Sequence, residues 1–336
     1  MSNKRNTILL VLLGAILFTM PLLLDAIGQS FLLGSATRIL IYAIAAMSLN
    51  LILGYGGMVS FGHAAFFGVG AYVTGILSFH MFEDTTIFGL AGTNSAAIAW
   101  LASIAISALM ALIIGALSLR TTGVYFIMIT LAFAQMIYFL FVSLQRYGGD
   151  DGFMMFDGRS RIAGLELGDD ISFYFVCLAA LAIFAMGFKT LVNSRFGQVL
   201  KGCHENEPRM RALGCPTYRY KLVAFVIAGA GAGFAGALQA NLTEFVSPDY
   251  VHWTRSGDLL IMVILGGIGT VLGPFFGAAA FLMLEEFLPI IFKGLGLPLL
   301  QEHWRVVFGP MLILIVLFAK KGLYASLMDW GRRKND

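Results

Sequence analysis

The segment GYGGMVSFGH, residues 54–63, places groups that could take part in chemistry beside residues that break helices. Tyr55, Ser60 and His63 supply a phenol, a hydroxyl and an imidazole. The segment lies in a run, residues 39–82, that contains no Asp, Glu, Lys or Arg. Non-helical backbone at membrane depth is tolerated only where it is buried in protein or lines a wet cavity. Two interpretations remain open: a packed helical hairpin, or an element of a solute pathway.

A new helix must follow the break, and we expect it to begin between Met58 and His63 with Ser60 as its cap. Broken helices in transporters direct their positive amino ends toward anionic parts of a solute. We therefore predict a permeation pathway near the middle of the membrane, lined by Gly54, Tyr55, Gly56, Gly57, Ser60 and His63. His63 alone is better explained as a hydrogen-bonded histidine of the bundle than as a direct contact of the solute.

Catalytic motifs are missing from the sequence, which contains no HExxH, no GxSxG and no GxxxxGK[ST]. Cys203, His204 and Cys215 could be imagined as metal ligands, but reduced thiols are the simpler interpretation. Ser256 lacks the glycine two positions earlier that an intramembrane serine protease motif requires, because Thr254 stands there. We expect no enzyme activity, metal or cofactor in this chain. Nucleotide-driven transport would need an ATPase on another chain.

Ionisable residues inside membrane spans are costly and therefore rare. Arg38, Asp258, Glu285 and Glu286 fall in the apolar parts of the chain, and we expect them towards the ends of spans. Proton-coupled and ion-coupled carriers usually need a carboxylate near the middle of the bilayer. Since none is evident, a self-sufficient secondary carrier is the less favoured alternative.

The elements that position these residues are apolar helices. The chain has 336 residues, of which 59% are hydrophobic and 12% charged, whereas soluble domains carry about 25% charged residues. About 20 apolar residues cross the hydrocarbon core. The predicted spans are 7–27, 31–53, 63–82, 96–119, 122–144, 171–191, 221–240, a hairpin within 258–292, and 303–319. We predict an all-α polytopic membrane protein: one domain, 1–336, with about 8–10 transmembrane helices and broken or re-entrant elements near 54–62 and 266–274.

Charge sets the orientation, because short loops rich in Lys and Arg stay in the cytoplasm. The basic loop 192–220 and both termini are therefore predicted to be cytoplasmic, and the acidic loop 145–170 periplasmic. Within the basic loop, Asn206 can cap a two-turn helix, Pro208 suits its first turn and Gly214 ends it. We expect this capped helix to be a docking element.

Small residues at a spacing of four indicate close helix packing. The sets are Gly229 with Gly233, Ala232 with Gly236, and Gly269, Gly273 and Gly277. They predict tight helix crossings.

Five segments together carry a family resemblance: LNLILGYGGMVSFGHAAFFGVGAYVTGIL, LRTTGVYFIMITLAFAQMIYF, GGDDG, ENEPRMRALGCPTYRYKLVAFVIAGAGAGFAGAL and SGDLLIMVILGGIGTVLGPFFGAAAFLMLEE. Matching in order from about residue 40 to 319, they resemble the LivM-type permeases of branched-chain amino acid ABC importers. Gln135, Pro208 and Cys215 depart from the family pattern. Gln135 stands where many relatives have Glu, so it carries no acidic role.

The resemblance implies a bacterial inner-membrane permease that works by alternating access. Its implied partners are a second homologous permease chain, two ABC ATPase subunits that use the ATP, and a periplasmic substrate-binding protein, with no nucleic acid. The coupling helix that it implies consists of Glu205, Asn206, Glu207, Arg209, Arg211, Ala212, Leu213 and Gly214. The solute could be leucine, isoleucine or valine. Urea, short amides or another small solute of the same superfamily remain the alternatives.

Overall fold

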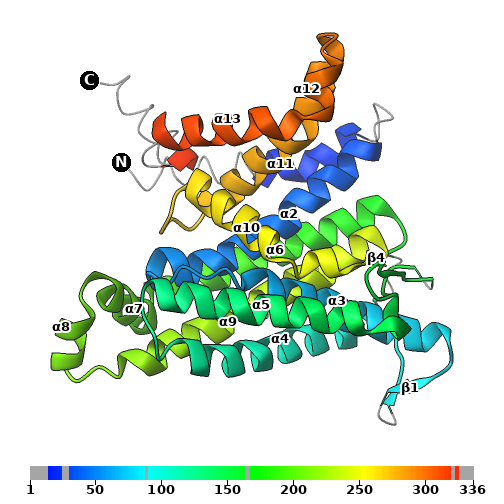
Figure 1. Ribbon diagram of the computed structural model, residues 1–336. Helices are drawn as coiled ribbons and strands as arrows, with labels where there is room; N and C mark the ends of the chain where they lie inside the picture. The colour runs from blue at the N-terminus through cyan, green and yellow to red at the C-terminus, as the bar shows by residue number, and fades with distance from the viewer. Residues whose placement is uncertain are drawn as a thin grey trace.

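A computed structural model describes residues 14–24, 30–87, 90–156, 158–162, 167–318 and 322–324. The helices are Gly14–Leu24, α2 (Ser30–Asn50), α3 (His63–Phe82), α4 (Ala96–Ser118), α5 (Val124–Ser143), α6 (Asp170–Asn193), α7 (Arg195–Glu205), α8 (Glu207–Ala212), α9 (Thr217–Thr243), α10 (Trp253–Gly266), α11 (Gly273–Gly294), α12 (Pro298–Glu302) and α13 (Trp304–Phe318). The strands β1 (Thr86–Ile87), β2 (Leu90–Ala91), β3 (Phe153–Met154) and β4 (Phe245–Val246) are short. The predicted all-α architecture is confirmed (Figure 1).

Seven helices in the described part of the chain are long and apolar enough to cross a membrane: α2 with its continuation to Tyr55, then α3, α4, α5, α6, α9 and α11. The helix Gly14–Leu24 and α13 are shorter apolar helices. Fourteen residues make α10 about 21 Å long, which is less than the hydrocarbon thickness. The predicted hairpin within 258–292 thus has one short arm and one full-length arm. Of the first predicted span, 7–27, only residues 14–24 are among those that the structure describes.

The connections separate into two ends of the bundle (Figure 1). One, here called the basic end, holds α7, α8 and the turn 119–123, which meet around one cavity. The other, the acidic end, holds the connections 83–95, 144–169 and 244–252. There β3 pairs antiparallel with β4, and the backbone of Arg161 pairs with that of Asn94. This separation is what the predicted alternation of loops requires.

Arg159 ties the acidic end together, although sequence reasoning did not single it out. Its side chain is only 9% exposed. It donates to the carbonyl oxygens of Asn241 and Leu167 at 3.2 and 3.3 Å and pairs with Asp170. Its guanidinium also lies 4.9 Å from the ring centroid of Phe173. One cation therefore fastens the loop before α6 to the end of α9.

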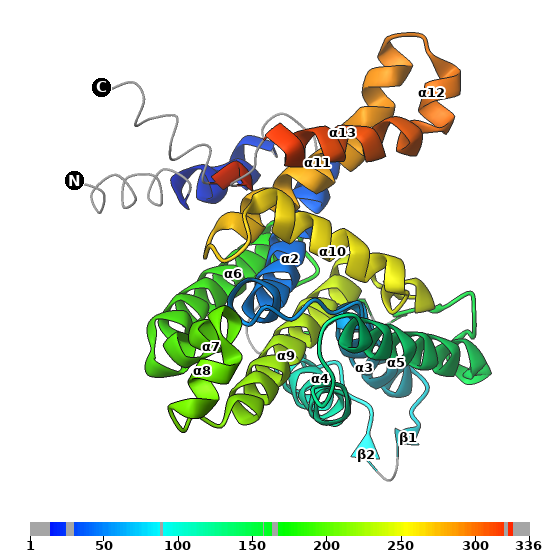
Figure 2. The same ribbon diagram turned by 60° about the vertical axis from the view of Figure 1, so that its left-hand side comes forward.

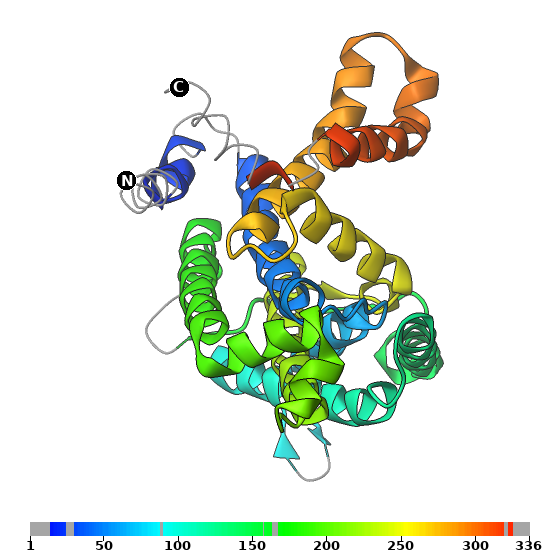
Figure 3. The same cartoon turned by 90° about the vertical axis from the view of Figure 1, so that its left-hand side faces the viewer.

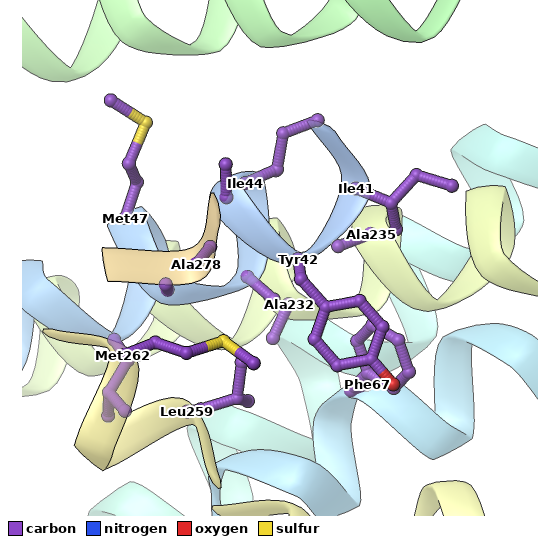
Figure 4. Close-up of a cluster of buried hydrophobic side chains, with 14 of the residues drawn as sticks. Ile41, Tyr42, Ile44, Met47, Phe67, Ala232, Ala235, Leu259, Met262 and Ala278 are labelled. Carbon is purple, nitrogen blue, oxygen red and sulfur yellow. The ribbon is translucent and has the colours of Figure 1, made fainter. Parts of the chain in front are cut away.

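The centre of the bundle is α2, whose residues from Leu40 to Asn50 are all buried. Figure 4 shows its side chains among small residues of α9 and α11 and larger ones of α3 and α10. Lipid tails are as apolar as these side chains, so close packing rather than water exclusion drives their association. The central position of α2 explains why its apolar character extends all round the helix.

The predicted close crossing of glycines is confirmed between α3 and α9. A Cβ atom at Gly70 would collide with the carbonyl oxygen of Gly233, and one at Gly236 would collide with that of Phe67. Gly273 and Gly277 likewise bring the start of α11 against the last turn of α10. Gly269, the third member of that predicted set, lies outside both helices in the break between them.

The carboxyl-terminal part of α11, together with α12 and α13, projects away from the bundle (Figures 2 and 3). Pro289 lies inside α11 without ending it, so the helix continues to Gly294. Glu285 and Glu286 are therefore 12 and 13 residues into a 22-residue helix. Our expectation that they lie towards a span end is wrong, because the helix that carries them begins at Gly273 and continues to Gly294.

Candidate functional site

The first break begins where the helix from Phe31 ends in a π-helical turn, Leu51–Tyr55. Residues 57–62 are then non-helical, and α3 starts at His63. Gly57, which has a φ of +66°, lies against His204 at the basic end, whereas Gly62 packs against Thr130 of α5. Thr130 is six residues from the start of α5, which corresponds to about 9 Å. The break thus enters the bundle from the basic end to about this depth, rather than lying at its middle.

The polar side chains of this break are buried in the bundle. His63 Nε2 lies 2.8 Å from Ser48 Oγ, and Ser48 Oγ in turn donates to the carbonyl oxygen of Ala45 at 2.7 Å. His63 and Ser60 are both fully buried. His63 is accordingly a hydrogen-bonded histidine of the bundle, which is the interpretation that the sequence analysis preferred.

The amino end of α3 is capped by a different serine from the one expected. Ser60 Oγ accepts from Gly62 N at 3.2 Å, within the break, so its predicted role as the helix cap is wrong. Instead, Ser256 of α10 accepts from Ala64 N at 2.8 Å. The non-helical stretch extends two residues past Ser60, which places its hydroxyl out of reach of the first turn. A residue 192 positions away fills that place.

The two predicted breaks meet in space. Asn50, the last residue of α2, donates through Nδ2 to the carbonyl oxygen of Thr270 at 2.7 Å and accepts at Oδ1 from Gly269 N at 3.0 Å. The second break runs through Gly267 and Gly269, whose φ values of +120° and +73° favour glycine. A Cβ at Gly54 would lie 2.5 Å from Gly269 N. Asn50 therefore holds the two irregular segments together.

The predicted helix of the basic segment is confirmed as α8. Asn206 accepts from Arg209 N at 2.9 Å, Pro208 lies in the first turn, and Gly214 ends the helix with a φ of +81°. Leu213 at its carboxyl end is 69% exposed. Of the predicted coupling residues, those other than Glu207 are exposed: Glu205, Asn206, Arg209, Arg211, Ala212, Leu213 and Gly214.

Glu207 faces inward and fastens α8 to α9. It pairs with Lys221 at 2.5 Å and Arg211 at 2.7 Å, and it accepts from Thr217 Oγ1 at 3.0 Å. Burial alone would raise the pKa of this carboxyl, but the hydrogen bonds from Lys221 and Arg211 outweigh that effect and hold the pKa below its usual value. Glu207 is therefore an anion that braces the helix.

Sequence reasoning missed α7, which connects α8 to the first break. Ser194 caps it by accepting from Gly197 N at 3.4 Å. Lys201 Nζ lies 5.3 Å from the ring centroid of Tyr55, so α7 packs on the π-helical turn. At its other end α7 packs on α8, where Gly202 faces the side chain of Met210. The serine followed by an amphipathic stretch is the signal that could have revealed this helix.

A cavity of about 360 Å³ brings the predicted pathway and coupling residues together. Gly56 and Gly57 of the break line one side, and Glu207 and Arg211 of α8 line another. The turn before α5 completes the wall. Movement of α8 would therefore change the surroundings of the break directly.

No group of three His, Cys, Asp or Glu side chains in the described residues is arranged to hold a metal ion. Cys203 is buried, and burial raises the pKa of its thiol. Its neighbour in the sequence, His204, faces the break instead.

A bundle of long apolar helices with two broken elements in contact, and an exposed helix joined to one of them, defines a multi-pass membrane protein of the transport class. The chain belongs to the family of permease components of branched-chain amino acid transport systems, which matches residues 31–316. The resemblance inferred from the sequence is thereby confirmed.

Three relatives illustrate the similarity. The chain is 26% identical to the high-affinity branched-chain amino acid transport system permease protein LivM of Salmonella typhimurium, over 91% of this chain and 74% of the relative. It is 26% identical to LivM of Escherichia coli K12, over 95% of this chain and 77% of the relative. It is also 26% identical to the permease protein LivH of Escherichia coli K12, over 84% of this chain and 90% of the relative. No solved structure matches the chain.

Proposed function

We propose that this chain is a permease subunit of a binding-protein-dependent ABC importer for branched-chain amino acids. It pairs with a second homologous permease chain in a bacterial inner membrane, with the basic end and both termini in the cytoplasm. Two ATPase subunits bind the basic end and hydrolyse ATP, and a periplasmic binding protein delivers leucine, isoleucine or valine at the acidic end. The chain itself uses no cofactor.

The observation that carries this proposal is the continuous contact from α8 through α7 to the first break. An exposed apolar tip at Leu213 is suited to a protein partner. Glu207 holds this helix on α9, and Met210 of the helix packs against Gly202 of α7, so a force applied at the tip is passed to α7. Because α7 packs on Tyr55, that movement reaches the π-helical turn and, through it, the predicted pathway segment 54–63. Alternating access would follow from such a displacement.

A self-sufficient secondary carrier is the second candidate. The position of Glu285 within α11 supports this candidate, because a carboxylate deep in a span is the group that ion-coupled carriers require. Urea or short amides are alternative solutes for the importer. The secondary carrier differs from the proposal in its energy source, and the urea or amide importer differs in the ligand of its binding protein.

The test is gentle extraction of the tagged chain from its native membrane, followed by uptake after reconstitution. Recovery of two ATPases, a second permease and a binding protein that binds leucine supports the proposal. Uptake by the chain alone without ATP would refute the importer and support the secondary carrier. A binding protein that binds urea but not leucine would show that the importer carries urea and not branched-chain amino acids.

Two variants locate the ATPase contact. Leu213→Asp should remove the ATPases from the purified assembly, because it places a charge at the exposed apolar tip of α8. Met154→Asp is the matched control, since Met154 is 60% exposed at the opposite end of the bundle. ATPase recovery that is equally high in both variants would contradict docking at α8.

A further inference from the structure

Charged side chains inside the described membrane helices gather on one face. Arg38 of α2 pairs with Glu285 of α11 at 3.4 Å, and Ser35 donates to Glu286. Beside them Arg255 pairs with Asp258 of α10 at 3.7 Å. We call these residues the charged face: Ser35, Arg38, Arg255, Asp258, Glu285 and Glu286. In α3, α4, α5, α6 and α9, every Asp, Glu, Lys and Arg lies within four residues of a helix end.

The depth of the charged face in the membrane can be measured along α2 and along α11, and the two helices agree. Arg38 is eight residues from the start of α2, and Glu285 is nine residues from the end of α11. At 1.5 Å per residue these separations are about 12 and 13 Å from the acidic end of each helix. Since the hydrocarbon core is about 30 Å thick, the Arg38–Glu285 pair lies within it.

The charged face is not sealed inside the chain. The side chains of Arg38 and Glu285 are 34% and 24% exposed, and those of Arg255 and Asp258 are each 31% exposed. Lipid solvates such groups poorly, so intramembrane charges face a bundle interior or a water-filled passage. Because these side chains are exposed on the surface of this chain, water or another protein must cover them.

The two ion pairs lie within electrostatic range of each other. Asp258 interacts electrostatically with Arg255, Glu285, Arg305 and Arg38. The Arg38 guanidinium lies 5.5 Å from the ring centroid of Tyr42, which keeps an aromatic wall beside the polar groups. The face therefore offers cations and anions a few ångströms apart, next to apolar surface.

A branched-chain amino acid has the complementary chemistry: a carboxylate, an adjacent ammonium and an aliphatic side chain. Charge-assisted hydrogen bonds to both ends are stronger than neutral ones and depend on which charge stands where. We propose that the charged face lines the substrate path and binds the zwitterion in transit, with Arg38 holding the carboxylate and Glu285 and Asp258 holding the ammonium. This inference rests on the proposed function, with the second permease chain closing the path.

The alternative is that Arg38 and Glu285 only hold α2 against α11. Exchanging the two charges, Arg38→Glu with Glu285→Arg, separates these explanations in the complete importer reconstituted with its ATPases and binding protein. The exchange keeps an ion pair between the helices but reverses its direction. We expect normal recovery of the assembly and leucine uptake lowered about 10-fold or more. The matched control exchanges the surface pair Glu83 and Arg146, which lies at 3.8 Å, and should transport like the wild type.

Thiol labelling gives a second test that does not depend on tolerance of the exchange. In a background without Cys177, Cys203 and Cys215, Ser35→Cys should react with a membrane-impermeant aqueous thiol reagent. Leucine-loaded binding protein with ATP should slow that reaction. Ile183→Cys is the control, because Ile183 is 67% exposed in the middle of α6, where we expect lipid and no reaction.

Two results would overturn the inference: wild-type uptake by the exchanged variant, or a Ser35→Cys variant as unreactive as Ile183→Cys both without nucleotide and with ATP trapped. Either result leaves the proposed function intact if the wild-type importer moves leucine with ATP. Failure of the wild-type assembly to transport leucine would refute the proposed function instead.

Discussion

The contact between the two helix breaks depends on one side chain, Asn50, and replacing it should destabilise the bundle measurably. Asn50 is fully buried, and its amide satisfies both the Gly269 N–H and the Thr270 carbonyl. Asn50→Leu keeps the approximate volume of the side chain but removes both partners. Asn50→Asp keeps the acceptor for Gly269 N and removes only the donor.

The magnitude follows from the number of groups left unpaired. A buried donor or acceptor without a partner costs about 1–3 kcal/mol. Asn50→Leu strands two such groups, so we expect a loss of about 2–6 kcal/mol, which is a large share of the 5–15 kcal/mol that typically stabilises a folded protein. Asn50→Asp strands one such group but also buries a carboxylate that has no cation beside it and faces the Thr270 carbonyl, so its loss should be at least as large.

The assay is the half-life of the purified protein in detergent at a fixed raised temperature, because membrane proteins often unfold irreversibly. Both variants should have shorter half-lives than the wild type. Asn193→Leu makes the same chemical change at an exposed position and should behave like the wild type. An Asn50→Leu protein as long-lived as the wild type would show that the two breaks are held together by other contacts.

Three further predictions concern other parts of the bundle. Gly70→Val should lower stability by about 3 kcal/mol or more, because its side chain would push against the Gly233 backbone, whereas Gly187→Val has open space and should be tolerated; equal thermal half-lives would contradict the crossing. Arg159→Met should lower the stability by about 3 kcal/mol, because the Asn241 carbonyl and the Asp170 carboxylate lose their partner, and Arg159→Lys should have an intermediate effect. The rate of proteolysis within the 145–170 loop measures how far the acidic end is loosened. The folded protein holds the pKa of Glu207 below its usual value of 4.5, so the ionised carboxylate stabilises the fold fully above pH 4.5, and this stabilisation is lost as the pH falls through the lower pKa of the folded state. On acidification the wild type should therefore lose more thermal stability than Glu207→Gln. Parallel profiles of thermal stability against pH would show that Glu207 does not brace α8.

Local signals predicted the helices well. The span 63–82 begins and ends as predicted, because it contains no Asp, Glu, Lys or Arg and a glycine-rich break precedes it. The short helix α8 also followed from its sequence, since Asn206, Pro208 and Gly214 act on backbone within a few residues of themselves. Such capping needs no knowledge of the rest of the fold.

Contacts between distant segments could not be predicted in the same way. Asn50 and Gly269 are 219 residues apart, and Ser256 caps a helix that begins near residue 63. Neither sequence neighbourhood carries a sign of its partner. The depth of Glu285 was misjudged, because it lies 12 residues after the start of α11 and the helix continues to Gly294. The pairing of Arg38 with Glu285 likewise depends on how α11 lies against α2.

The crossing of α3 and α9 has a mechanical consequence. With bare backbone in contact at Gly70 and Gly233, the two helices cannot move closer, but α9 can tilt about that point. Gly233 lies about 24 Å along α9 from Thr217 and about 15 Å from Thr243, so the crossing is a fulcrum with unequal lever arms. A sideways displacement of about 3 Å at the Thr217 end would become about 2 Å in the opposite direction at the far end. There β4 follows α9 and pairs with β3, so a push at one surface of the membrane would shift the connections at the other.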